Sequence, residues 1–496
     1  MSRRLLLVAL LHSVTACATA PINVPLDRYD ASAGYRYQNL SADDNSDGLF
    51  VILSFSGGGT RAAAFSFGVM EALHDVRYRA AGGSERRLLQ DVDVIASVSG
   101  GSFTAAYYAL FPDTFFSKFP EEFLHRDIER ALIGRVLRPW NWARLARPDF
   151  DRIHLAVELY DETVFHERTF GDLLAGRRKP FIILNATDMT LGRRFEFTQE
   201  QFDLLCSDVS RTKVAAGVAA SSAFPGLLSP LTLKNFATAG CGFTKPEWME
   251  TGLDRAHNPL ERYARARDLA SYQDHKEERP YIHLLDGGLA DNIGLRGPYV
   301  ALKLGDTEWN VPARISAGAT RRVLVITANA KTKPRRDWDQ RESAPGLLDV
   351  LSFVASGPMD NYSFDTVQLV RDFFVEQRRA ERARASCERE MRRTCPEATL
   401  PGILPDVEYH AVELSFDAVP DEALRECLEN LPTSFALQEA QVTLLRRAGR
   451  ALVMGSSELG EAMRAIDPSW TPDPVPIDRA LIEQACPTTA RQGAPR

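Results

Sequence analysis

One five-residue segment, Ser97-Val98-Ser99-Gly100-Gly101, constrains the fold of this chain most strongly. The apolar run Asp93-Val94-Ile95-Ala96 before it predicts the end of a buried strand, and residues 102–110 after it predict a helix. A serine on a tight strand-to-helix turn has a strained backbone and an exposed hydroxyl, the arrangement called a nucleophile elbow. Ser99 is therefore the candidate nucleophile, with Ser97, Gly100 and Gly101 as the small residues of the elbow.

The first 17 residues have the pattern of an export signal. Arg3-Arg4 precede a run of seven apolar residues, too few to cross a bilayer, which needs about 20. The run leads to Val14-Thr15-Ala16-Cys17, which resembles a bacterial lipobox, so the resemblance implies acylation of Cys17; ordinary cleavage nearby is the alternative. Ala18 resembles the residue of lipoproteins sorted to the outer membrane. We therefore expect an exported lipoprotein, anchored in the outer membrane on the periplasmic side or at the cell surface.

Composition narrows the classes of partner. The 496 residues are 45% hydrophobic, enough for one large domain or two ordinary ones. The formal net charge is -7, and the sequence has no basic stripe, so a nucleic-acid partner is not expected.

Six cysteines follow Cys17, an even number that allows up to three disulfides in an exported chain. Their pairing stays open, and they are Cys206, Cys241, Cys387, Cys395, Cys427 and Cys486. The sequence has no Cys-x-x-Cys motif and no Cys/His cluster, so we expect no metal site.

The body of the chain is expected at residues 46–455, between a tether at 18–45 and a surface tail at 456–496. Short apolar runs without polar alternation are typical of strands buried on both faces, as in a parallel sheet covered by helices. Four such runs join the one before the elbow, at residues 49–53, 181–184, 281–285 and 323–326. Helical stretches lie between them, so the predicted class is α/β.

Two further segments have a structural and a functional interpretation. Large residues gather between the elbow helix and Pro180, namely Phe111, Phe115, Phe116, Phe119, Phe123, Trp140 and Trp142. Core packing is favoured for most of them, and an inserted apolar cap over an acyl-chain site is the alternative. The mixed-charge run from Val375 to Arg393 is interpreted as the solvated face of a helix.

A glycine-rich loop offers hydrogen-bond donors for a reacting oxyanion. The strand at residues 49–55 runs into Ser56-Gly57-Gly58-Gly59-Thr60-Arg61, and a helix is predicted over 62–73. Successive glycines let backbone N–H groups point into one cavity beside a helix N-terminus. The spacing Gly57-x-Gly59-x-x-Ala62 also fits a dinucleotide fingerprint. That alternative is disfavoured, because the elbow occupies the position where the ribose-binding acid should stand.

Asp286-Gly287-Gly288 supplies the candidate base. The aspartate follows the apolar run at residues 281–285, and the glycines allow a tight turn. A simple turn is the alternative for this motif alone. Because ligands collect at the carboxyl ends of parallel strands, we expect Asp286 at the same sheet edge as Ser99 and the glycine loop.

These segments, in this order, resemble the patatin-like phospholipase family. The resemblance is carried by the glycine loop, the elbow, Ala220-Ser221-Ser222-Ala223-Phe224-Pro225-Gly226 and Asp286-Gly287-Gly288; it spans residues 46 to 330 and continues through residues 431–435. It implies a three-layer α/β/α fold with a mainly parallel sheet. Two residues depart from the family pattern: Ser97 replaces the first elbow glycine, and Ser56 stands where an acid sometimes precedes the loop.

The same resemblance implies a Ser/Asp dyad in which Asp286 activates Ser99 without an imidazole. Gly57, Gly58, Gly59 and Arg61 then belong to the oxyanion-hole segment. The implied activity is hydrolysis of phospholipid or lysophospholipid esters without a cofactor. A lipid-binding lipoprotein that retains the fold without turnover is the alternative. His410 lies in an alternating segment typical of a strand and is interpreted as structural.

Overall fold

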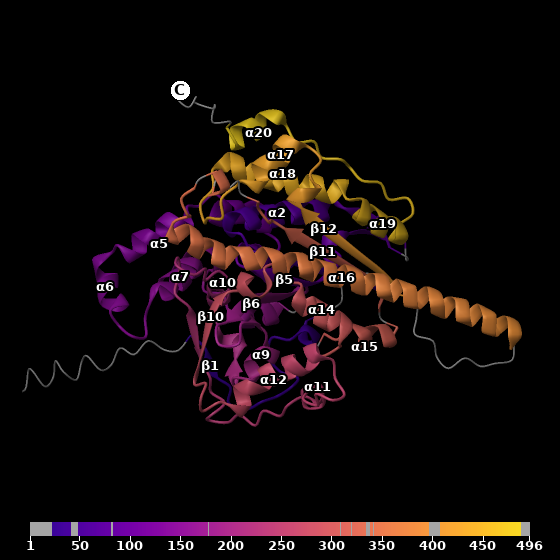
Figure 1. The fold of residues 1–496 in the computed structure, drawn as a ribbon, viewed down its shortest axis with the longest axis horizontal. Helices are drawn as coiled ribbons and strands as arrows, with labels where there is room; N and C mark the ends of the chain where they lie inside the picture. The colour runs from indigo at the N-terminus through magenta and orange to yellow at the C-terminus, as the bar shows by residue number, and fades with distance from the viewer. Residues whose placement is uncertain are drawn as a thin grey trace, which may run out of the picture.

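The protein is an α/β structure in which helices cover both faces of one large sheet (Figure 1). The computed structural model describes residues 22–40, 48–80, 83–176, 178–307, 309–318, 320–333, 338–340, 342–395 and 407–487. No helix within these ranges combines the length and the apolar character needed to cross a membrane. The predicted signal segment, with Cys17, lies outside the described residues.

Eight strands form the central sheet, in the order β12-β11-β2-β5-β6-β10-β9, with β7 also paired to β6. From β12 to β6 all neighbours are parallel, whereas β7, β9 and β10 run antiparallel to the strands they pair with. The strands are β2 (Gly48–Phe55), β5 (Val92–Val98), β6 (Phe181–Asp188), β7 (Arg193–Glu196), β9 (Leu231–Lys234), β10 (Tyr281–Asp286), β11 (Thr320–Asn329) and β12 (Glu408–Ser415).

The predicted α/β class and mainly parallel sheet are confirmed, and all the apolar runs predicted as strands lie in this sheet. The direction of β10 was not foreseen. Its side chains alternate between exposed and buried, because it lies near the end of the sheet where one face is open. An apolar run indicates burial and says nothing about the direction of the strand.

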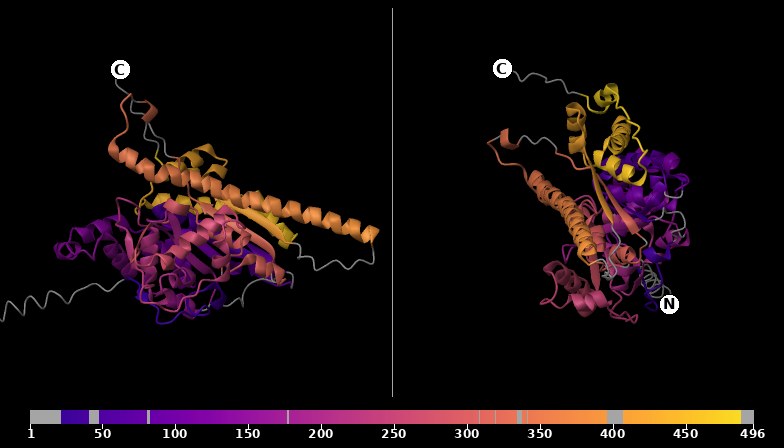
Figure 2. Two further views of the ribbon diagram at one scale, coloured as in Figure 1. Left: turned by 60° about the horizontal axis from the view of Figure 1, so that its bottom comes forward. Right: turned by 90° about the vertical axis from the view of Figure 1, so that its right-hand side faces the viewer.

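Helices form a layer on each face of the sheet. The chain passes from β2 through α2 to β5, and from β11 through α16 to β12 in the opposite direction across the sheet. Because crossovers between parallel strands are right-handed, α2 and α16 lie on opposite faces (Figure 2). The helices are α2 (Gly59–Asp75), α3 (Gly100–Leu110), α4 (Phe115–Phe119), α5 (Ile128–Val136), α6 (Pro139–Leu145), α7 (Arg152–Tyr160), α8 (Phe170–Gly176), α9 (Gln199–Asp203), α10 (Val214–Ser221), α11 (Glu247–Gly252), α12 (Leu260–Asp274), α13 (Gly288–Asp291), α14 (Arg296–Lys303), α15 (Val311–Ser316), α16 (Leu347–Thr394), α17 (Glu422–Glu429), α18 (Glu439–Gly455), α19 (Ser457–Ile466) and α20 (Arg479–Ala485).

The segment expected to be a tether is structured over residues 22–40. Strand β1 (Val24–Pro25) pairs with β8 (Ser207–Asp208). The buried Tyr35 hydroxyl accepts a hydrogen bond from the Ile182 N–H at 2.9 Å, and Arg36 pairs with Asp203 at 2.5 Å. This part of the chain therefore belongs to the domain. Its aromatic and arginine side chains bond to groups far away in the sequence, which composition does not reveal.

The segment expected to be a surface tail from residue 456 is also packed. Helix α19 buries Leu459, Ala462 and Met463, and α20 is joined to the helix layer by a disulfide between Cys427 and Cys486. A second disulfide joins Cys206 to Cys241, while Cys387 and Cys395 are free and exposed. Two of the three disulfides that the cysteine count allows are therefore formed in the described chain.

Two glycines allow α18 to pack closely on α2. A Cβ on Gly68 would lie 2.1 Å from the carbonyl oxygen of Arg446, and one on Gly449 would lie 2.6 Å from that of Phe65. Neither clash could be relieved by a rotamer change, because both opposing atoms are backbone. The C-terminal helix layer therefore depends on the absence of side chains at these two positions.

We expect Gly68→Ala to destabilise the fold by about 3 kcal/mol, because the added methyl group forces two backbones apart. Gly134→Ala is the matched control. Gly134 lies in helix α5 with no atom within 4 Å of an added Cβ, so alanine there should be neutral or stabilising. Urea denaturation of the two variants measures both effects, and equal stabilities would contradict the assignment of a close helix contact.

Candidate active site

Ser99 lies at the turn between β5 and α3 and has a strained backbone. Its φ is 50° and its ψ is -119°, a conformation that a residue with a side chain rarely adopts. The next residue explains why the strain persists. A Cβ on Gly100 would lie 1.9 Å from the carbonyl oxygen of Gly59, so α3 begins in direct backbone contact with the glycine loop. The predicted elbow geometry is thus present, with Ser99 only 6% exposed.

A chain of hydrogen-bonded hydroxyl groups beneath the elbow explains why a serine is suitable at position 97. The hydroxyls of Ser97 and Ser102 lie 3.1 Å apart, and that of Ser102 lies 2.9 Å from the hydroxyl of Ser221. Ser221 donates in turn to the carbonyl oxygen of Asn185 at 2.6 Å and accepts the Ser99 N–H at 2.9 Å. The residue that departs from the family pattern therefore has a hydrogen-bond partner of its own, in a space that a larger side chain could not enter.

Asp286 reaches the elbow from a direction that the sequence did not suggest. It ends β10, which runs antiparallel to β6. The turn is held by backbone bonds, because Asp286 N–H donates to the Ala223 carbonyl at 3.0 Å and Gly287 N–H to the Ser221 carbonyl at 3.1 Å. A Cβ on Gly287 would lie 2.1 Å from the Asn185 carbonyl oxygen, so a glycine is required there. The expected meeting of Asp286 with the elbow thus occurs, although the two strands are not parallel.

The charge state of Asp286 suits proton transfer. The residue is 3% exposed, and its Oδ1 accepts the Gly288 N–H at 2.8 Å. Burial raises the pKa of this carboxyl to about 7, while hydrogen bonds from Gly288 and from the Ser99 side chain hold it lower than burial alone would. A carboxyl with this pKa can both accept and return a proton near neutral pH.

The glycines of the loop differ in backbone conformation and hydrogen bonding. Gly58 and Gly59 have φ values of 139° and 59°, which only glycine adopts readily. The Gly57 N–H donates to the carbonyl oxygen of Asn292 at 2.9 Å, so it is already engaged. The Gly58 and Gly59 N–H groups make no such backbone bond in the described chain, so they are available as donors. Within the segment that the resemblance assigns to the oxyanion hole, Gly57 thus fixes the loop.

Arg61, which the resemblance assigns to the same segment, holds the loop from behind. The side chain is buried and donates to the carbonyls of Ala330 and Leu431 at 3.1 and 3.0 Å and to the Thr433 hydroxyl at 2.7 Å. A Cβ on Gly58 would lie 2.9 Å from its Nη2. Arg61 thus ties the glycine loop to the end of β11 and to residues 431–433, and we assign it a positioning role.

Two residues at the site were missed by the sequence analysis. Tyr160 is fully buried, its ring lies 4.9 Å from that of Phe103 on α3, and its hydroxyl meets no partner in the described structure. Burial raises its pKa, the Ser222 hydroxyl opposes the rise and the Asp286 charge adds to it. Asn292 has an equally unpartnered amide oxygen, which would lie 2.5 Å from a Cβ on Gly57. In the sequence, Asn292 could have been singled out only because it follows the Asp-Gly-Gly motif, four residues after Gly288. No sequence motif points to Tyr160.

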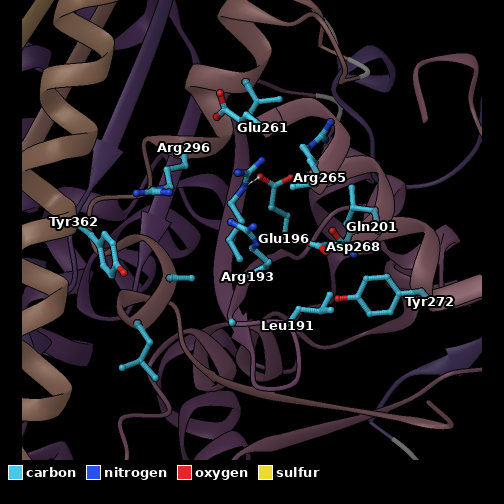
Figure 3. Close-up of a pocket in the computed structure, with 17 residues that line it drawn as sticks. Leu191, Arg193, Glu196, Gln201, Glu261, Arg265, Asp268, Tyr272, Arg296 and Tyr362 are labelled. Atoms are coloured by element: carbon cyan, nitrogen blue, oxygen red, sulfur yellow. Dashed lines mark hydrogen bonds and ion pairs between the residues drawn. The ribbon is translucent and has the colours of Figure 1, made fainter. Parts of the chain in front are cut away.

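The surroundings of the site are apolar on one side and charged on the other. Phe103 stacks on Phe123 at 4.1 Å, and Phe165 and Phe435 lie 6.0 Å from it. Beyond α13, on the far side of the Asp286 turn, lies a cavity of about 340 Å³ (Figure 3). Its charged lining consists of Arg193, Arg194, Glu196, Glu261, Arg265, Asp268 and Arg296. The cavity therefore suits a polar group.

The fold and the site together define a class, the α/β proteins that carry a serine nucleophile elbow beside a glycine loop. Residues 53–299 match the family model described as patatin-like phospholipase, and this part of the chain belongs to that family. The resemblance drawn from the motifs is therefore confirmed. Members of this family are typically lipid acyl hydrolases.

Solved structures show more distant similarity. Human GIVD cytosolic phospholipase A2 is similar with a TM-score of 0.40 and 12% identity, over 91% of this chain and 68% of that one. VipD from Legionella pneumophila is similar with a TM-score of 0.26 and 11% identity, over 92% of this chain and 77% of that one. No curated protein matches the chain in sequence.

The raised pKa of Asp286 predicts a stability cost that depends on pH. The folded chain binds this proton with a pKa of about 7, compared with an ordinary aspartate value of 3.8, so folding stability falls as pH rises between these values. Asn carries no charge at any pH. We expect Asp286→Asn to be more stable than the parent by roughly 3 kcal/mol near pH 8 and by little near pH 4. Thermal unfolding across this range measures the difference, and the exposed Asp473→Asn is the control, expected to track the parent throughout.

Proposed function

We propose that the chain is a serine acyl-ester hydrolase that cleaves fatty acyl esters of phospholipids or lysophospholipids through a Ser99/Asp286 dyad. The observation that carries this proposal is the meeting of a strained elbow serine with a buried carboxylate whose pKa is about 7. The family match supports a phospholipid substrate.

The sheet order separates His410 from the strand that carries Ser99. His410 is the single histidine after Asp286. It lies on β12, with β11 and β2 between that strand and β5. Neighbouring strands are about 4.8 Å apart, which puts His410 about 14 Å from the strand of the nucleophile. A Ser/His/Asp triad through His410 is thus excluded by distance, and its interpretation as a structural residue on a strand fits this position.

The reaction proceeds in two halves. Asp286 takes the hydroxyl proton of Ser99 as the serine oxygen attacks the ester carbonyl, and the Gly58 and Gly59 N–H groups stabilise the oxyanion. The protonated Asp286 then returns the proton to the leaving alcohol, and the acyl group remains on Ser99. In the second half, water gives its proton to Asp286 and attacks the acyl-enzyme. Collapse releases the fatty acid, and the proton returns to the Ser99 oxygen.

Tyr160 has a place in this scheme as a substrate-binding residue, and Asn292 as a positioning residue. The Tyr160 hydroxyl lies near Asp286 and Ser222 without a hydrogen-bond partner of its own. We assign it to the substrate side, as a donor that finds its acceptor only when an ester is bound. Asn292 holds the Gly57 amide through its carbonyl group and so keeps the glycine loop facing Ser99.

We expect Ser99→Ala and Asp286→Ala each to lower kcat/KM on p-nitrophenyl esters and on a lysophospholipid by at least about a thousandfold. His410→Gln is the control and should retain activity. For the parent, kcat/KM should rise with pH through about 7 and then level off, because only the ionised Asp286 accepts the serine proton. A fluorophosphonate probe that fails to label Ser99 in folded protein would instead favour the lipid-binding lipoprotein without turnover.

We also propose that the mature chain is anchored in the outer membrane through acylated Cys17. The support is the lipobox-like segment at residues 14–17 and the Ala18 that follows it. We expect the parent expressed in a bacterium to partition into the detergent phase and Cys17→Ser into the aqueous phase. An N-terminal peptide of unmodified mass from the parent would count against acylation.

A further inference from the structure

Helices α5 and α6 carry an unusual outward face. They project at one end of the molecule, away from the central sheet (Figure 1). The inward face of α5 buries Ile128 and Leu132. On the other face, Arg130, Ile133 and Leu137 follow at spacings of three and four residues, and Ile133 and Leu137 are 51% and 64% exposed. The helix is therefore apolar on two sides, although only one of them contacts the protein.

Two tryptophans extend this exposed face onto α6. Trp140 is 64% exposed and Trp142 is 59% exposed, so these two are exceptions to the core packing expected for most large residues of this segment. By contrast, Phe115, Phe119 and Phe123 are fully buried as expected. The Trp142 indole donates to the Val136 carbonyl at 3.0 Å, so its ring is fixed at the surface. Four large apolar side chains thus meet solvent within ten residues of sequence.

Arginines around this face outnumber the nearby acids Asp127 and Glu129, whereas the net charge of the whole chain is -7. Arg126, Arg130 and Arg138 are exposed, and none of them pairs with a carboxylate within the described residues. The Arg138 guanidinium lies 5.7 Å from the Trp140 ring. Cations beside exposed tryptophan, leucine and isoleucine are typical of a surface that enters the headgroup region of an anionic bilayer.

Hydrogen bonds and ion pairs attach α5 and α6 firmly to each other and to α7. Asn141 is buried and donates to the Arg135 carbonyl at 2.8 Å, which fixes α6 to α5. Arg135 and Arg144 both pair with carboxylates on or next to α7, namely Glu158 and Glu162. Helix α7 ends at Tyr160, whose ring packs on Phe103 of the elbow helix α3, so the exposed face and the elbow are connected through one helix.

We propose that Ile133, Leu137, Trp140 and Trp142, together with Arg126, Arg130 and Arg138, form a membrane-docking surface for anionic lipid bilayers. The occupant is the lipid interface itself. The apolar side chains insert between the headgroups, and the arginines contact lipid phosphates. The surface acts independently of the proposed acyl anchor at Cys17 and does not require the proposed hydrolysis.

The experiment measures binding to vesicles separately from catalysis. The full chain carrying Ser99→Ala and Cys17→Ser, which can neither hydrolyse lipid through Ser99 nor be acylated at Cys17, is mixed with phosphatidylcholine vesicles with or without phosphatidylglycerol. We expect binding to the anionic vesicles that weakens with added salt. Trp140→Ala/Trp142→Ala should lower the affinity at least about tenfold. Arg130→Glu and Arg138→Glu should each lower it at least about fivefold.

Phe364→Ser is the matched control, because Phe364 is 68% exposed on α16, outside the proposed surface. Its vesicle binding should equal that of the parent. The proposal is overturned by any of three results: no binding of the parent to anionic vesicles, unchanged binding of the tryptophan variant, or an equal loss in Phe364→Ser. A parent dimer that the tryptophan substitutions convert to monomer, without vesicle binding, would identify the surface as a protein interface and would also overturn it.

Discussion

Ser221 is the residue on which the geometry of the site depends. Its hydroxyl accepts the Ser99 N–H and the Ser102 hydroxyl and donates to the Asn185 carbonyl, and its own carbonyl accepts the Gly287 N–H. One small side chain at the end of α10 therefore connects the elbow, β6 and the Asp286 turn. Each of these hydrogen bonds is buried, so losing any of them would leave a polar group without a partner.

Close backbone contacts also fix the geometry of the site. The glycine loop and α3 touch at Gly59 and Gly100, and the loop is held from behind by Arg61. Asp286 is then placed in a space where water cannot stabilise its charge, which raises its pKa to about 7. The same burial that makes the carboxylate a useful base makes it costly to the fold, so activity and stability oppose each other at this residue.

The exposed face of α5 and α6 shows the limits of composition as a guide. The aromatic residues between Phe111 and Trp142 look alike in sequence. Their density predicted core packing for most of them, and an apolar cap over an acyl-chain site was the alternative. The first part of the segment packs around Phe103, whereas Trp140 and Trp142 point into solvent. Which aromatic residue is buried depends on what each helix packs against, and that partner lies far away in the sequence.

Local pattern was sufficient for the α/β class, the main strands, the elbow at Ser99, the glycine loop and the family. These depend on short-range features: apolar runs, glycines at turns and the order of motifs. Tertiary structure decided the remaining features. These are the antiparallel direction of β10, the packing of residues 22–40 and of α19 and α20, the hydrogen bond of the Gly57 amide and the contacts of Arg61 behind the loop. Each depends on a hydrogen bond or contact between residues distant in the chain, and no local pattern records which distant group will be the partner.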